Sequence, residues 1–147
     1  MTSTPSTRPP SKGLDIGLWC AQALLALVYV PAGAMKLFSP VAEVAAQIPW
    51  AGDVPEIALR LIGVVDLSAG LGLLLPTITR IAPRLTVWAA AGSIALQVCA
   101  MAFHFIRGEY PVILMNVVII ALSAFVLWGR AGRAAVTARS TARAIAR

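Results

Sequence analysis

The sequence is poor in the residues that most often carry metal binding and covalent catalysis. It has one histidine and two cysteines in 147 residues, and Cys20 and Cys99 lie in separate apolar runs rather than in a C-x-x-C pair. No His and Cys residues have zinc-ligand spacing, and a single histidine excludes a bis-histidine haem site. Phosphate-binding glycine loops, the serine-elbow motif and H-E-x-x-H are also absent. We therefore expect no metal site, and we expect both cysteines to be small core residues without a disulfide.

Charge is scarce as well, which excludes an ordinary soluble domain. Only 12% of residues are charged, 59% are hydrophobic, and the mean hydropathy is +0.84. A soluble domain of this length has too little interior to bury so much apolar surface, so the surroundings are expected to be a lipid bilayer. The net charge of +6 comes from chain ends and loops rather than from a basic face, and we expect no nucleic-acid partner.

Four apolar runs are long enough to cross the roughly 30 Å hydrocarbon core of a bilayer. Pro76 is expected to end the second run, and residues 39–56 are expected to form a loop with a short interfacial helix over 40–48. The first run is too long for the apolar part of a signal peptide. Because the later loops are short, the predicted fold class is all-α, an antiparallel four-transmembrane-helix bundle. The expected spans are 14–38, 57–75, 85–106 and 110–128.

The expected organisation has a membrane domain over residues 13–129 between two tails. Residues 1–12 are rich in Pro, Ser and Thr, which predicts a disordered tail. Residues 130–147 are basic and are expected either to be solvated or to lie as a helix on anionic lipid. Of the twelve Lys and Arg residues, only Lys36, Arg60 and Arg107 fall on the opposite side of the spans from the tails. The positive-inside rule therefore predicts that both termini are cytoplasmic.

Asp66 is the feature around which the spans are expected to pack. A carboxylate at this depth costs roughly 2.5–3.5 kcal/mol on insertion scales, so it should face protein, within reach of Lys36 or Arg60 directly or through water. Counting about 1.5 Å per residue places other polar side chains in the same half of the membrane and leaves the opposite half nearly featureless. The candidate ligand-binding residues are Tyr29, Lys36, Asp66, Gln97, His104 and Asn116.

Each of these residues also has a structural interpretation. A lysine near the end of a span often extends its ammonium to the headgroups, and His104 can be an unpartnered interfacial histidine. Gln97 and Asn116 can simply hydrogen-bond between helices. In the functional interpretation, Lys36 is a cationic anchor, Asp66 is a buried acceptor, and His104 donates or relays a proton near neutral pH.

Two segments resemble the DoxX-like family of small four-span membrane proteins. Gly33-Ala34-Met35-Lys36-Leu37 resembles the family's G-x-x-K-L feature, and the segment from Gly63 to Pro76 resembles its glycine-rich run ending in L-L-L-P. His104, the Gly108-Glu109 turn and Asn116 fit as well, whereas the family usually has glutamate where this chain has Asp66. The resemblance covers about residues 14–130 and implies a multi-pass protein of the cytoplasmic membrane. The Ala- and Arg-rich composition suggests a bacterium.

Three functions remain open from the residues and the resemblance. The first is a non-catalytic subunit or small-ligand-binding module whose outward-opening polar cavity takes a quinone- or lipid-like molecule. The second is a quinone-linked membrane oxidoreductase subunit, as the resemblance to some family members implies. The third is a chaperone-like partner of another membrane protein. Whether the chain is an enzyme, and whether it pairs with another membrane protein or with a second copy, stays undecided.

Overall fold

The computed structural model describes residues 11–139, and the regular secondary structure within them is helical. The predicted all-α bundle is confirmed. The tail segments expected over residues 1–10 and 140–147 lie outside the described residues.

Four helices are long and apolar enough to cross a membrane. The first begins two residues earlier than expected, because Ser11 Oγ accepts a hydrogen bond from Leu14 N at 3.3 Å and caps the helix. Lys12 therefore belongs to the first helix and not to a tail. The long helices are α1 (Lys12–Phe38), α3 (Glu56–Thr79), α4 (Arg84–Ile106) and α5 (Tyr110–Trp128), and a π-helical turn, η2 (Gly129–Arg133), continues the last of them.

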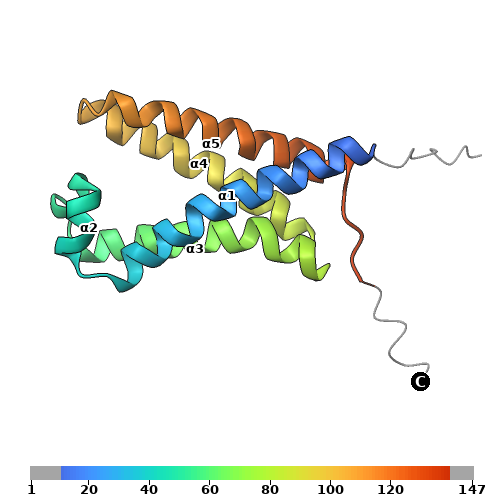
Figure 1. The fold of residues 1–147 in the computed structure, drawn as a ribbon, viewed down its shortest axis with the longest axis horizontal. Coiled ribbons are helices and arrows are strands. Elements are labelled where there is room, and N and C mark those ends of the chain that lie inside the picture. The colour runs from blue at the N-terminus through green and yellow to red at the C-terminus, as the bar shows by residue number, and fades with distance from the viewer. Residues whose placement is uncertain (1–10, 140–147) are drawn as a thin grey trace, which may run out of the picture.

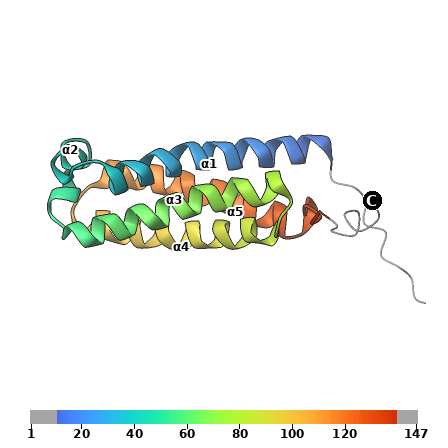
Figure 2. The ribbon, with the colours of Figure 1, turned by 90° about the horizontal axis from the view of Figure 1, so that it is seen from below.

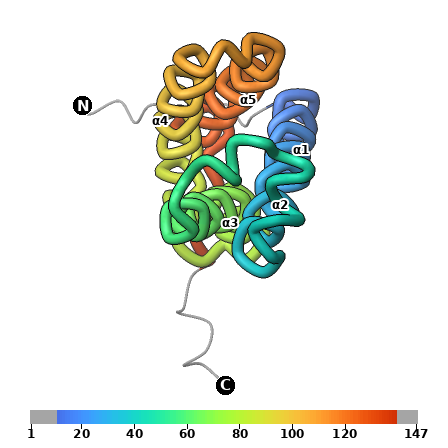
Figure 3. The backbone as a smooth tube through the Cα atoms, turned by 90° about the vertical axis from the view of Figure 1, so that its left-hand side faces the viewer, coloured from blue at the N-terminus to red at the C-terminus, as the bar shows by residue number. Residues whose placement is uncertain are grey.

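Consecutive long helices are connected at alternate ends of the bundle (Figures 1 and 2). The main contacts join α1 to α3, α3 to α4, α4 to α5 and α5 back to α1, so the helices form a ring. The two short elements α2 (Val41–Gln47) and η1 (Pro49–Gly52) lie across one end of this ring (Figure 3). We call this end the α2 end, and the end at which α1 begins and α5 finishes the terminal end.

The expectation that Pro76 ends the second span is wrong. Helix α3 continues through Pro76 to Thr79 and stops where Arg80 adopts a left-handed conformation with φ 58°. Proline is tolerated inside membrane helices because neighbouring groups can satisfy the freed carbonyl. The extra turn carries Thr77 into the bundle, where it is buried.

Glycine brings α1 and α3 unusually close together. A Cβ atom on Gly33 would lie 2.6 Å from the backbone nitrogen of Leu67, and one on Gly63 would lie 2.9 Å from the Cβ of Lys36. Small residues allow this kind of backbone approach between membrane helices. The approach places Lys36 beside the middle of α3.

The expectation that the two cysteines are core residues is wrong. Cys20 and Cys99 are both free and exposed, as are large apolar side chains such as Leu27 and Trp88. An apolar exterior is what a lipid environment favours, and the buried positions hold many of the polar residues instead. Cysteine in an apolar run was therefore not evidence of burial here.

Candidate functional site

The six predicted ligand-binding residues line a single pocket of about 620 Å³. They come from all four long helices: Tyr29 and Lys36 from α1, Asp66 from α3, Gln97 and His104 from α4, and Asn116 from α5. We call this space the main pocket. That it binds a ligand stays a prediction.

Lys36 and Asp66 form a buried ion pair in the main pocket. Lys36 Nζ donates to Asp66 Oδ2 at 2.7 Å, and the two side chains are 8% and 9% exposed. The lysine is therefore turned inward rather than extended to the headgroups. Asp66 faces protein, as expected for a carboxylate at this depth.

Arg60 does not serve as a partner of Asp66. Its Nη1 donates to the carbonyl oxygens of Lys36 at 2.6 Å and Ser39 at 2.8 Å, and its Nη2 pairs with Glu56 at 2.8 Å. These carbonyls lie at the C-terminal end of α1, where the helix itself offers them no donors. Arg60 thus caps the C-terminal end of α1 and fixes the backbone at Lys36.

A chain of hydroxyl and amide groups crosses the bundle beside the ion pair. Gln97 Nε2 donates to Tyr29 Oη at 2.9 Å, and Tyr29 Oη lies 2.7 Å from Ser93 Oγ. Ser93 Oγ in turn lies 2.8 Å from Ser123 Oγ. These bonds tie α1, α4 and α5 together, so Tyr29 and Gln97 have a structural role in addition to lining the pocket.

His104 belongs to a charged cluster at the α2 end of the pocket. Its Nδ1 lies 2.6 Å from Glu109 Oε2, Arg107 Nε donates to Glu109 Oε1 at 2.7 Å, and Arg107 Nη2 donates to Asp53 at 2.8 Å. The hydrogen bond from Arg107, followed by that from His104, lowers the pKa of Glu109 below its ordinary value. Because Glu109 is then a carboxylate, His104 Nδ1 carries the hydrogen of this contact.

Asn116 projects from α5 into the same pocket and is buried. In the amide orientation that satisfies both of its groups, its nitrogen donates to the Val112 carbonyl at 3.1 Å and its oxygen accepts from Met101 N at 3.2 Å. Asn116 therefore joins α5 to α4, which is the structural role expected of a buried amide.

Trp50, in the segment expected to connect the first two spans, also lines the main pocket. Its ring packs edge-to-face on Phe103 with 5.7 Å between centroids. Because Trp50 sits in η1, the segment across the α2 end forms part of the pocket wall. In the sequence, Trp50 follows Pro49 at the start of a short turn. This pattern does not predict which way the Trp50 ring faces.

A smaller void of about 250 Å³ adjoins the main pocket between α3 and α4. We call it the side pocket. It shares five lining residues with the main pocket and adds three of its own, Val54, Cys99 and Phe103, of which Cys99 and Phe103 are exposed. The shared residues are Trp50, Ile62, Leu96, Ala100 and His104.

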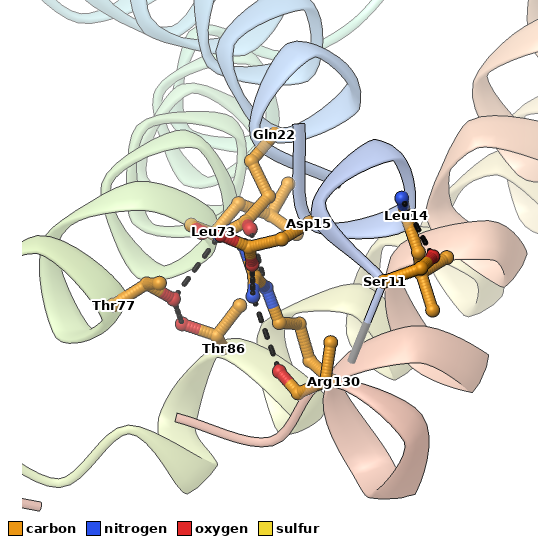
Figure 4. Close-up of polar contacts among 9 residues, drawn as sticks. Ser11, Leu14, Asp15, Gln22, Leu73, Thr77, Thr86 and Arg130 are labelled. Atoms are coloured by element: carbon orange, nitrogen blue, oxygen red, sulfur yellow. Dashed lines mark hydrogen bonds and ion pairs between the residues drawn. The ribbon is translucent and has the colours of Figure 1, made fainter. Parts of the chain in front are cut away.

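The expectation that the half of the bundle near the termini is nearly featureless is wrong. Figure 4 shows Arg130 reaching between α1, α3 and α4. Its Nε donates to Gln22 Oε1 at 2.8 Å, and its Nη1 donates to Asp15 Oδ1 at 2.7 Å. Gln22 Nε2 donates to Thr77 Oγ1 at 3.1 Å, and Thr77 Oγ1 lies 2.9 Å from Thr86 Oγ1.

Arg130 was missed because it was assigned to a basic tail over residues 130–147, expected either to be solvated or to lie as a helix on anionic lipid. A signal was available, since Asn116, Ser123 and Arg130 recur every seven residues and so share one helix face. All three are buried. The turn η2 continues the helix far enough for this face to reach Arg130, whereas the chain from Ala134 to Arg139 is not helical.

Across residues 11–139, no group of three or more His, Cys, Asp and Glu side chains is placed to hold a metal ion. The main pocket instead offers a cation, a carboxylate, an imidazole and an amide on otherwise apolar walls.

Four apolar helices packed around buried polar side chains define a small multi-pass membrane protein. The family model described as the DoxX-like family matches residues 20–126, and the chain belongs to this family. The matched region contains all six candidate residues, whereas Asp15 and Arg130 fall outside it. No curated protein and no solved structure matches the chain.

Proposed function

We propose that this protein is a non-catalytic membrane module that binds a small amphipathic ligand of quinone or lipid type in the main pocket. The observation that carries the proposal is the convergence of six polar side chains from four helices on one pocket of about 620 Å³. This volume lies within the roughly 300–1,000 Å³ typical of ligand sites, which are mostly apolar with a few placed polar groups.

The polar groups match the oxygens of a quinone or hydroquinone head. Lys36 has three N–H donors, and one of them donates to Asp66. The other two can donate to a quinone carbonyl. In its neutral form with hydrogen on Nδ1, His104 would accept a hydroquinone O–H through Nε2. The apolar walls, which include Val28, Ile62 and Ile119, suit a ring or an acyl chain.

Binding is tested by fluorescence, because Trp50 lines the pocket and quinones quench tryptophan. In detergent solution, a short-chain quinone analogue should quench the wild type saturably, and Trp50→Phe should lose the saturable component. Lys36→Met should weaken binding roughly 10- to 100-fold, as loss of a charge-assisted hydrogen bond predicts. Lys12→Met removes the same charge from the other end of α1 and should bind like the wild type.

A double variant and a copurification assay separate the possible causes of a loss of binding. The double variant Lys36→Met, Asp66→Asn leaves no unpaired charge, so it separates loss of binding from loss of folding. Quenching that rises linearly with quinone and is equal in wild type and Lys36→Met would refute the proposal. A second copurifying membrane protein bound through the pocket would favour the chaperone-like alternative instead.

The oxidoreductase alternative is favoured by one contact, the 2.6 Å approach of His104 Nδ1 to Glu109. An imidazole backed by a carboxylate at the edge of the pocket can pass a proton between a bound hydroquinone and the surface. This alternative predicts turnover of the quinone analogue with an artificial electron donor, and Glu109→Gln should slow turnover more than it weakens binding.

We further propose that the protein lies in a bacterial cytoplasmic membrane with both termini inside and the main pocket opening outward. The support is the distribution of charge. Among residues 11–139, three Lys and Arg residues lie at the α2 end, Lys36, Arg60 and Arg107, and six lie at the terminal end, Lys12, Arg80, Arg84, Arg130, Arg133 and Arg139. Such an excess of Lys and Arg is typical of the cytoplasmic side.

This orientation is tested by labelling in a background with Cys20→Ser and Cys99→Ser, since both native thiols are exposed. Ala46→Cys, on the exposed side of α2, should react with an impermeant maleimide on intact cells. Ile81→Cys, in the connection between α3 and α4, should react only after lysis. The reverse pattern would invert the topology.

A further inference from the structure

A second pocket, of about 480 Å³, lies at the terminal end of the bundle. We infer that this terminal pocket binds the phosphate of an anionic phospholipid head group. The inference is independent of any ligand in the main pocket. Its lining joins α3, the start of α4, η2 and the segment after η2, and the residues used below are Thr77, Arg84, Trp88 and Arg130.

Arg130 lines this pocket, and in the part of the chain that the structure describes its side chain carries a buried donor without a partner. Its side chain is 3% exposed, and its Nε and Nη1 are spent on Gln22, Asp15 and the Ala134 carbonyl. Among the described residues, its Nη2 has no hydrogen-bond partner although it is buried. A buried guanidinium donor left unpaired is costly, so an acceptor on a ligand would stabilise it.

The charge around the pocket is positive and uncompensated. Asp15 is the acidic residue of this end, and it is paired with Arg130 at 2.7 Å. Within residues 11–139, the other cations here form no ion pair with a carboxylate, and of these Arg84 lines the pocket. The pocket also lies at the N-terminal end of α4, where the helix dipole favours an anion. These other cations are Lys12, Arg80, Arg84, Arg133 and Arg139.

The position of the pocket favours a lipid over a free anion. It lies where the apolar spans end, and its rim residue Trp88 is 73% exposed, beside exposed Ile81 and Leu85. Tryptophan at the end of a span is typical of the headgroup level. A phosphate seated between Arg84 and Arg130 would thus leave its acyl chains along the exposed apolar face of α4. Basic pockets between membrane helices take anionic head groups in this way.

The experiment is native mass spectrometry of the full chain, titrated with phosphatidylglycerol or phosphatidylcholine of identical acyl chains. The first phosphatidylglycerol should bind more tightly than phosphatidylcholine, and Arg84→Gln should weaken it about fivefold, as loss of one near-surface cation predicts. Arg133→Gln is the matched control, because Arg133 stacks on Trp128 at the same end but outside the pocket lining. It should leave the first binding step unchanged.

A parallel arm distinguishes the source of the phosphate group. Inorganic phosphate alone should neither raise the melting temperature of the wild type nor displace phosphatidylglycerol. If phosphate does both in wild type but not in Arg84→Gln, the site binds free phosphate and the lipid assignment is overturned. Equal losses in Arg84→Gln and Arg133→Gln, or no preference over phosphatidylcholine, would show diffuse attraction to the surface and overturn the site.

Discussion

Among residues 11–139, Lys36 and Asp66 form the only ion pair at the α2 end in which both side chains are buried. The distance from Lys36 Nζ to Asp66 Oδ2 is 2.7 Å. Two charges withdrawn from water are expensive, and their attraction offsets this cost only while both are present. The aspartate side chain is short, and the close approach of α1 to α3 at Gly33 and Gly63 brings Lys36 within its reach.

Breaking this pair should destabilise the fold strongly. Asp66→Asn and Lys36→Met should each lower the free energy of unfolding by about 3–5 kcal/mol, because each leaves an uncompensated buried group. The double variant should cost clearly less than the two single losses added together. Equilibrium unfolding in mixed micelles measures all four states of the cycle, and strict additivity would contradict a direct interaction.

Glu109 should make stability depend on acidity. Its pKa is lowered by Arg107 and His104 from an ordinary value of 4.5, so its stabilising contribution is fully present above that value. The contribution is lost as the pH falls through the lower folded-state pKa. The melting temperature of Glu109→Gln should therefore be below that of wild type at neutral pH, and the difference should shrink on acidification. Glu43→Gln, on the exposed side of α2, should show no such convergence.

At the scale of the helical element, glycine placement decides how α1 and α3 meet. The stripe that contains Gly63, Asp66 and Gly70 was visible in the sequence as one helix face. A Cβ on Gly70 would approach Val30 to 2.7 Å, so the close contact extends along the helix pair. Pro76 lies inside α3 and is buried, so the helix does not end there.

A single methyl group at the contact should separate the two helices. Gly33→Ala would place its Cβ 2.6 Å from the Leu67 backbone nitrogen, and backbone cannot move aside as a side chain can. We expect a loss of about 1–3 kcal/mol in the free energy of unfolding, as for overpacked cores, together with weaker quinone binding. Gly92→Ala is the matched control because nothing lies within 4 Å of its Cβ. It should be neutral or slightly stabilising.

At the scale of the whole molecule, the exterior of the described residues is largely apolar, and the interior combines an apolar core with two polar centres. We propose that a ligand enters the one at the α2 end through the side pocket, because the two pockets share five lining residues and the side pocket adds exposed Cys99. A hydrophobic ligand dissolved in the bilayer would reach the main pocket by this route without entering water. Native Cys99 lies on the route, and Cys20 lies on α1 toward the terminal end.

Modification of Cys99 should therefore block ligand access. Alkylation with a bulky membrane-permeant maleimide in a Cys20→Ser background should slow and weaken quenching of Trp50 by the quinone analogue. The same reagent on Cys20, in a Cys99→Ser background, should leave quenching unchanged. Equal effects at the two thiols, or none at either, would show that the ligand enters elsewhere.

The sequence by itself determined the helical class, the four spans and six of the polar residues that line the main pocket. Each of these follows from local information: apolar length sets the spans, and helical periodicity places polar residues on one face. The side chains at the candidate site converge because each is the polar exception on an apolar helix, which leaves it one direction to face.

Only the tertiary structure decided which polar groups pair and what closes the two ends. Lys36 rather than Arg60 meets Asp66 because the glycine contact draws α1 onto α3, and Trp50 turns inward because η1 lies across the α2 end. Arg130 enters the bundle because η2 prolongs α5 and because Asp15, 115 positions earlier in the chain on α1, lies where it can accept its hydrogen bond. Such pairings depend on the distances between helices, and a one-dimensional pattern does not contain those distances.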